Sequence, residues 1–118
     1  DRLRQVFANL LGNAIKFSAD GDAVTVRVSP AASSQVCVEI RDSGLGMTAE
    51  ELSRLFEKFT QGDNVRREAK RYGGLGLGLS ISKTIVELHS GTISATSAGR
   101  GLGSIFKVML PVVRMTAV

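Results

Sequence analysis

Residues 24–40 read VTVRVSPAASSQVCVEI, and this stretch decides the fold class that the sequence predicts. Val24, Val26 and Val28 alternate with polar residues, which is the pattern of a half-buried strand. The same alternation returns at residues 36–40 after a polar connection, so the two strands are expected to form a hairpin. Paired strands of this kind indicate an antiparallel sheet with one covered face.

Helical patterns lie on both sides of this hairpin. Residues 1–18 predict an amphipathic helix, because apolar residues recur there at three- and four-residue spacing. Its predicted apolar stripe consists of Leu3, Phe7, Leu10, Ala14 and Phe17. After the hairpin, Thr48 and Glu51 have the spacing of a capping box, which predicts a short helix through about Leu55.

The rest of the chain completes the predicted order of elements. Residues 60–75 show no sustained period and are expected to form a long loop. The elements after it are a second long helix from near Gly76 to Gly91, marked by Ile81, Ile85 and Leu88, and strands at about 91–97 and 104–110. This order predicts an α+β fold in which one sheet carries helices on one face.

Size and composition restrict the possibilities further. The 118 residues have 43% hydrophobic and 22% charged content, which fits one soluble globular domain over residues 1–118. Cys37 and His89 are the only residues of their types, so an intrachain disulfide and a zinc site of several Cys or His ligands are excluded. We expect Cys37 to pack in the core and His89 to cap a helix end. No apolar run is long enough to span a membrane. The sequence begins without Met and inside the pattern of an amphipathic helix, which suggests a segment of a longer protein.

The charge of the chain points to an anionic partner. The net charge is +4 and the pI is about 9.7, which suits a nucleic acid, an acidic surface or a phosphate ligand. Four basic residues fall in residues 66–71, but only Tyr72 is aromatic there. A nucleic-acid-binding domain therefore has only the charge in its favour, because stacking platforms need several aromatic side chains.

Three polar residues share one face of the first predicted helix. On a helical wheel, Asn9, Asn13 and Lys16 fall within about 60° of one another. Such a set can be a solvated helix face. It can also be a ligand site, because an amide oxygen can bind Mg²⁺ and a lysine one turn further can reach a phosphate.

Two glycine-rich segments stand next to predicted elements. Residues 42–47, DSGLGM, directly follow a strand and form either a tight turn or part of a ligand loop. A dinucleotide-binding fold is disfavoured, because the chain is too short for its two halves. Residues 73–79, GGLGLGL, open the second long helix, where backbone N–H groups can approach an anion. A flexible linker is the alternative, and the interleaved leucines argue against it.

Taken in order, these segments resemble the catalytic ATP-binding domain of sensor histidine kinases, in the superfamily that includes gyrase, Hsp90 and MutL. The resembling segments are residues 9–18 (NLLGNAIKFS, the N box), 42–47 (the first glycine box), 55–61 (LFEKFTQ, the F box), 73–79 (the second glycine box) and 101–106 (GLGSIF, in the terminal strand). The resemblance implies a Bergerat-type fold, which is a two-layer sandwich of a mixed, mainly antiparallel sheet with helices on one face.

The resemblance also implies a site for ATP and Mg²⁺. Asp42 would accept a hydrogen bond from the adenine amino group, while Gly44 and Gly46 would admit the ring. On the first helix, Asn13 would bind Mg²⁺ with support from Asn9. Lys16 would meet a phosphate, and Phe17 would lie over the nucleoside.

The second half of the implied site lies in and around the long loop. Residues 61–75 would form the ATP lid, with Phe56 and Phe59 anchoring its start and Arg71 or a neighbour reaching the phosphates. Backbone N–H groups of the second glycine box would bind the triphosphate, and the residues assigned there are Gly74, Leu75, Gly76, Leu77 and Gly78. Leu75 and Ser90 depart from the residues common in the family, which are Thr and Gly.

The activity that the resemblance implies is transfer of the γ-phosphate to a histidine. Hydrolysing relatives such as gyrase carry a glutamate at the position of Asn9, and that glutamate activates water. An amide cannot act as this base, so efficient hydrolysis is not expected. The acceptor would lie on a separate upstream helical dimerisation domain, since His89 does not match it. A response regulator receiver domain would be the next partner, in a two-component phosphorelay in the cytoplasm. Neither nucleic acid binding nor direct membrane insertion of this segment is expected. The alternative is a non-transferring, nucleotide-binding regulatory module of the same fold.

Overall fold

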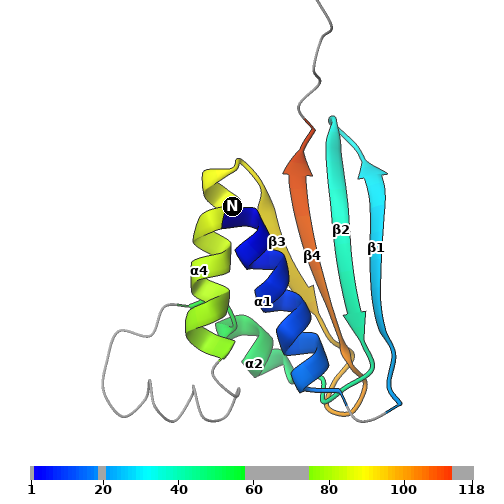
Figure 1. The fold of residues 1–118 in the computed structure, drawn as a ribbon. Helices are drawn as coiled ribbons and strands as arrows, with labels where there is room; N and C mark the ends of the chain where they lie inside the picture. The colour runs from blue at the N-terminus through cyan, green and yellow to red at the C-terminus, as the bar shows by residue number, and fades with distance from the viewer. Residues whose placement is uncertain (1, 19–20, 58–74, 113–118) are drawn as a thin grey trace, which may run out of the picture.

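The computed structural model describes residues 2–18, 21–57 and 75–112, and it consists of two layers (Figure 1). The helices are α1 (Arg2–Lys16), α2 (Ala49–Arg54) and α4 (Leu75–Leu88). The strands are β1 (Val24–Ala31), β2 (Gln35–Asp42), β3 (Thr92–Thr96) and β4 (Ser104–Pro111). The strands form one sheet, and α1 and α4 pack side by side on one of its faces (Figure 1). The α+β class with helices on one face is confirmed.

The sheet has the strand order β1-β2-β4-β3, and each of these neighbouring pairs is antiparallel. The predicted hairpin forms β1 and β2. Strand β4 lies between β2 and β3, so the C-terminal strand of the described part is inserted beside the first hairpin. This insertion brings the start of β4 next to the end of β2, where the 42–47 turn begins.

The core lies between the sheet and the two long helices. Alternation along a strand places every second residue on the same face, so Ile40 and Val38 face the helices together with their β4 partners Phe106 and Val108. Ile40 and Val108 are almost completely buried, as are Val6 and Leu10 of α1 and Leu79 and Val86 of α4. Burying a side chain of this size stabilises the fold by about 1.5–3 kcal/mol.

The long helices bury somewhat different faces from those predicted. In α1 the buried residues are Val6, Leu10 and Ala14, whereas the predicted Leu3, Phe7 and Phe17 are only partly buried. In α4, Ile85 is buried as expected, but Ile81 and Leu88 are 49% and 70% exposed. The reason is that each helix packs against both the sheet and the other helix. The buried face therefore differs from the apolar stripe that was predicted from the sequence.

The ends of α2 and α4 have well-defined caps. The predicted capping box of α2 is confirmed, with Glu51 N–H donating to Thr48 Oγ1 (3.1 Å) and Thr48 N–H donating to Glu51 Oε1 (3.0 Å). At the end of α4, Gly91 N–H donates to Val86 O and Ser90 N–H donates to Glu87 O, the pattern of a Schellman motif. Ser90 has φ of 62° there, so it adopts the left-handed conformation that favours glycine.

The edge strand β1 differs from its prediction as a half-buried strand. Val24 is partly buried, but Val26 and Val28 are 50% and 63% exposed. Both share a face with the buried Ile40, yet the helices do not extend over β1 in Figure 1.

On the opposite face of the sheet, a hydrogen bond from Arg41 (3.0 Å) lowers the pKa of Glu39. Cys37 of β2 lies next to Val38 and therefore also on this opposite face, where it is only partly buried, so the prediction that it packs in the core is wrong.

Candidate functional site

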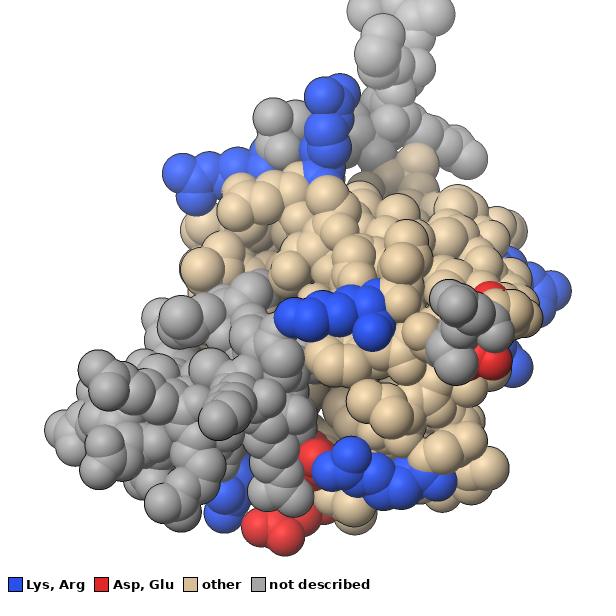
Figure 2. All heavy atoms as spheres, turned by 60° about the horizontal axis from the view of Figure 1, so that its bottom comes forward, with Lys and Arg blue, Asp and Glu red and all other residues tan. Residues whose placement is uncertain are grey.

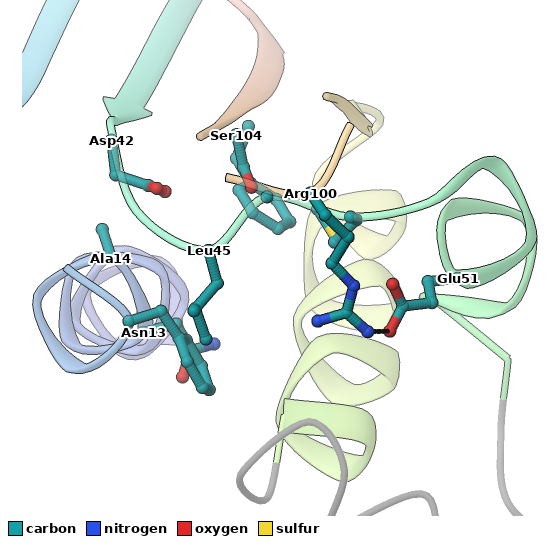
Figure 3. Close-up of a pocket in the computed structure, with 11 residues that line it drawn as sticks. Asn13, Ala14, Asp42, Leu45, Glu51, Arg100 and Ser104 are labelled. Atoms are coloured by element: carbon teal, nitrogen blue, oxygen red, sulfur yellow. Dashed lines mark hydrogen bonds and ion pairs between the residues drawn. The ribbon is translucent and has the colours of Figure 1, made fainter. Parts of the chain in front are cut away.

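A pocket opens at the end of the sheet where β2 ends and β4 begins (Figure 3). Its cavity measures about 50 Å³. The apolar residues that line it are Ala14, Phe17, Leu45, Met47 and Phe106, together with Gly46, and the polar ones are Asn13, Asp42, Glu51, Arg100 and Ser104. A mostly apolar pocket with a few convergent polar groups is the usual form of a small-molecule site.

Asp42 supplies a buried carboxylate to this pocket. It is the last residue of β2 and faces the helices because it lies two residues beyond Ile40. Only 8% of Asp42 is exposed, and Gly44 N–H donates to its Oδ1 atom (2.9 Å). A carboxylate accepts up to about four hydrogen bonds, so Asp42 can take a further donor from a ligand.

Asn13, which is partly buried, brings a buried amide nitrogen to the same pocket. Among the described residues, its Nδ2 atom is the buried side-chain nitrogen or oxygen that has no hydrogen-bond partner. Leaving such an atom unpaired costs about 1–3 kcal/mol, so a group of this kind points to a ligand. The amide oxygen of the same side chain is a suitable Mg²⁺ ligand.

The described residues hold no cluster of three or more His, Cys, Asp or Glu that could bind a metal by themselves. Mg²⁺ bound together with a nucleotide usually keeps waters and takes only one or two protein ligands besides phosphate oxygens. Asn13 is the described residue that would hold it.

The other two polar residues predicted on α1 do not line the pocket. Asn9 is partly buried, and its Nδ2 atom donates to Ser82 Oγ of α4 (3.1 Å), so it connects the two long helices. Lys16 is exposed, and its Nζ atom lies 5.8 Å from the centroid of the Phe17 ring. Of the predicted residues on and just after α1, the structure therefore brings Asn13 and Phe17 into the pocket.

The glycines of the 42–47 turn allow close contacts between backbone segments. A Cβ atom on Gly44 would collide with the carbonyl oxygen of Phe17, and one on Gly46 would collide with that of Gly99. Gly46 also has φ of 65°. Gly46 lines the pocket, whereas Gly44 does not. These contacts give a structural reason for both glycines beside their predicted place around an adenine ring.

The turn between β3 and β4 holds the pocket from the other side, and sequence analysis did not assign it a role. Ser97 Oγ accepts from Met47 N–H (2.9 Å) and donates to Gly103 O (2.6 Å). Gly101 N–H donates to Leu45 O (2.6 Å). The two glycine-rich turns therefore form one hydrogen-bonded unit at the mouth of the pocket.

Sequence analysis also missed most of the other lining residues. Arg100 Nη2 donates to Glu51 Oε2 (2.6 Å), which joins the β3–β4 turn to the start of α2. Phe106 lines the pocket and makes an edge contact with Phe56, with ring centroids 6.4 Å apart. The spacing of Thr48 and Glu51 indicated only the cap. Ser104 and Phe106 fell in the segment 101–106 that resembles the terminal strand, without a role in the site, and no local signal marked Arg100.

The remaining predicted residues lie at the start of α4 or outside the described part. Leu75, Gly76, Leu77 and Gly78 form the first turn of α4, which has 14 residues. The N-terminus of a helix favours anions because its first N–H groups have no partner within the helix. Phe59, Arg71 and Gly74 lie outside the described residues, as do residues 61–74 of the predicted lid.

The surface around this end of the molecule carries charges of both signs. Figure 2 shows the end of the molecule at the bottom of Figure 1, where Lys and Arg side chains stand apart from one another and some lie beside acidic ones. On the described part of this face, the basic side chains form no continuous patch. None of the described helices has both the length and the apolar character that crossing a bilayer requires.

The fold and this pocket define a nucleotide-binding domain of one known family. Residues 1–114 match the family described as histidine kinase-, DNA gyrase B- and HSP90-like ATPases. The chain is 44% identical over 113 residues to sensor histidine kinase AruS of Pseudomonas aeruginosa, covering 92% of this chain and 11% of that protein. It is 42% identical over 111 residues to the circadian input-output histidine kinase CikA of Synechococcus elongatus, covering 93% of this chain and 14% of that protein.

Solved structures show the same similarity. The mycobacterial sensor histidine kinase MprB matches with a TM-score of 0.74 and 29% identity, over 94% of this chain and 70% of that one. Full-length ShkA in complex with AMPPNP matches with a TM-score of 0.76 and 29% identity, over 98% of this chain and 22% of that one. The chain belongs to this ATPase family, and its resemblance to the catalytic ATP-binding domain of sensor histidine kinases is confirmed.

Proposed function

We propose that this domain binds Mg-ATP in the pocket of Asp42 and Asn13 and transfers the γ-phosphate to a histidine of a separate upstream helical domain. The observation that carries the proposal is the pairing, in one pocket, of a buried carboxylate with a buried amide nitrogen that has no partner. The AMPPNP bound to the structural relative ShkA supports a nucleotide as the ligand.

Each end of the nucleotide has a matching group in this arrangement. Asp42 accepts hydrogen bonds only, so it suits the amino group of adenine. Asn13 would hold Mg²⁺, and the first turn of α4 would favour the negative charge of the phosphates. The chemistry that Mg²⁺ would supply when bound there is neutralisation of charge on the phosphates.

The chemistry of α1 supports transfer rather than hydrolysis. Asn9 cannot act as a general base for water, and its amide is hydrogen-bonded to Ser82. The acceptor must then come from another domain, held in line with the γ-phosphate. A response regulator receiver domain would take the phosphate next, and a cytoplasmic location remains a prediction from the single cysteine.

The test is phosphotransfer from radiolabelled ATP, with the parent's upstream helical domain added as a separate polypeptide. We expect acid-labile, base-stable label on a histidine of the added domain and none on the isolated chain. The matched control is the Asp42→Asn variant, which should bind ATP weakly and transfer little. ATP binding without transfer would instead support the regulatory nucleotide-binding module, and label on His89 would contradict the proposal.

A further inference from the structure

We propose that Arg100, held in place by Glu51, is a specificity-determining residue of the base pocket and donates a hydrogen bond to a ring nitrogen of the purine. This inference rests on the proposed function, because it assumes that the pocket receives the base of a nucleotide. It gives Arg100, which lines the pocket from the β3–β4 turn, a role in binding the base.

The polar groups of the pocket have complementary hydrogen-bonding properties. Asp42 enters from the end of β2 and only accepts hydrogen bonds, while Arg100 enters from the β3–β4 turn and only donates them (Figure 3). Between them the lining is largely apolar. A flat heteroaromatic ring that carries both an amino group and acceptor nitrogens matches this pair, and adenine is such a ring.

Glu51 fixes the position of the guanidinium group. Only 4% of Glu51 is exposed, and its carboxylate is held from two sides by Thr48 N–H (3.0 Å) and by Arg100 Nη2 (2.6 Å). Because the backbone of α2 and the capping box set where this carboxylate lies, the arginine is oriented before a ligand arrives. Preorganised donors of this kind bind without a large ordering cost.

The backbone beside Arg100 is also restrained. Gly101 N–H donates to Leu45 O, and Leu102 N–H donates to Gly99 O across the turn. The ion pair uses Nη2, and a guanidinium group has five N–H donors in one plane. Half of the Arg100 side chain is exposed, at 51%, so its other nitrogens stay within reach of a ligand at the pocket mouth.

A purely structural role is the competing explanation, in which Arg100 only neutralises the buried Glu51. Replacing Arg100 alone would leave that charge uncompensated, which is strongly destabilising. The test therefore uses the double variant Arg100→Met with Glu51→Gln, which removes both charges and keeps side chains of similar length. The matched control is Arg54→Met with Glu50→Gln, because this ion pair lies on α2 and Arg54 is also 51% exposed.

The probes are ATP and its 1-deaza, 3-deaza and 7-deaza analogues, each of which lacks one acceptor nitrogen of the ring. We expect one analogue to bind the wild-type chain about tenfold more weakly than ATP. The double variant should bind ATP about tenfold more weakly and should no longer distinguish that analogue from ATP. The control variant should retain the wild-type affinities and their ratios.

Thermal unfolding of each variant confirms that the compared chains are folded. The inference is overturned if no analogue is discriminated by the wild-type chain, or if a folded double variant keeps the wild-type ratios. It is also overturned if the control variant loses the same discrimination. Failure of the wild-type chain to bind ATP would instead reject the proposed function itself.

Discussion

Asp42 and Ser104 face each other across the pairing of β2 with β4, and each is only 8% exposed. The next two pairs in the same row are apolar, with Ile40 opposite Phe106 and Val38 opposite Val108. The row of core residues therefore ends in two polar groups at the point where the pocket begins. This register places a carboxylate at the edge of the core, where a ligand can reach it.

The first prediction concerns Asp42. Asp42→Ala should weaken ATP binding about ten- to a hundredfold, because a hydrogen bond to a charged group is worth about 1.5–3 kcal/mol. Isothermal titration calorimetry measures the change, and Asp22→Ala on the exposed segment before β1 is the control. Unchanged ATP affinity in a folded Asp42→Ala chain would reject the pocket as the base site.

The second prediction separates ligand binding from stability at Asn13. Asn13→Ala should remove the Mg²⁺-dependent part of ATP binding. The ligand-free variant should nevertheless be at least as stable as the wild type, because it loses a buried unpaired nitrogen and alanine is the better helix former. Mg²⁺ titrations and denaturant unfolding measure the two effects, with Gln5→Ala as an exposed control on the same helix. An unaltered response to Mg²⁺ would show that Asn13 is not a ligand.

The third prediction concerns the end of α4. Ser90→Gly should increase the free energy of unfolding by about 0.5–1 kcal/mol. The left-handed conformation strains residues other than glycine by about 1–2 kcal/mol, and the substitution removes this strain. Part of the gain is lost because glycine gives up more backbone conformational entropy on folding. Ser90 has φ of 62°, whereas Ser90→Ala keeps the strain and should give little gain. Urea unfolding of both variants measures the difference. Equal stability of the two would contradict this explanation.

The fourth prediction compares two glycines with different surroundings, Gly44 in the turn after β2 and Gly12 inside α1. Gly44→Ala should destabilise the chain by about 1–3 kcal/mol, because the new Cβ atom collides with the Phe17 carbonyl. Gly12→Ala lies in α1 with no atom within 4 Å of its Cβ and should stabilise by about 1 kcal/mol. Thermal unfolding measures both shifts. The explanation fails if the two substitutions act in the same direction.

Much of the fold follows from local patterns in the sequence. The alternation in residues 24–40 predicted the hairpin, and the spacing of Thr48 and Glu51 predicted the capping box, because both depend on neighbouring backbone groups. The glycine-rich turn after β2 was likewise located from sequence. The family resemblance that rested on these motifs was correct.

Tertiary structure decided which side chains meet in the site. The Arg100–Glu51 contact joins residues 49 positions apart, and the Asn9–Ser82 hydrogen bond joins residues 73 positions apart. Neither contact has a local signal, because each depends on how β4 inserts beside β2 and how α4 packs on α1. The same packing gives Asn9 a hydrogen-bond partner on α4 and leaves Asn13 in the pocket, although both lie on one face of α1. Local backbone preferences therefore determined the elements, whereas the pocket wall was determined by contacts that exist only once the sheet and helices have packed.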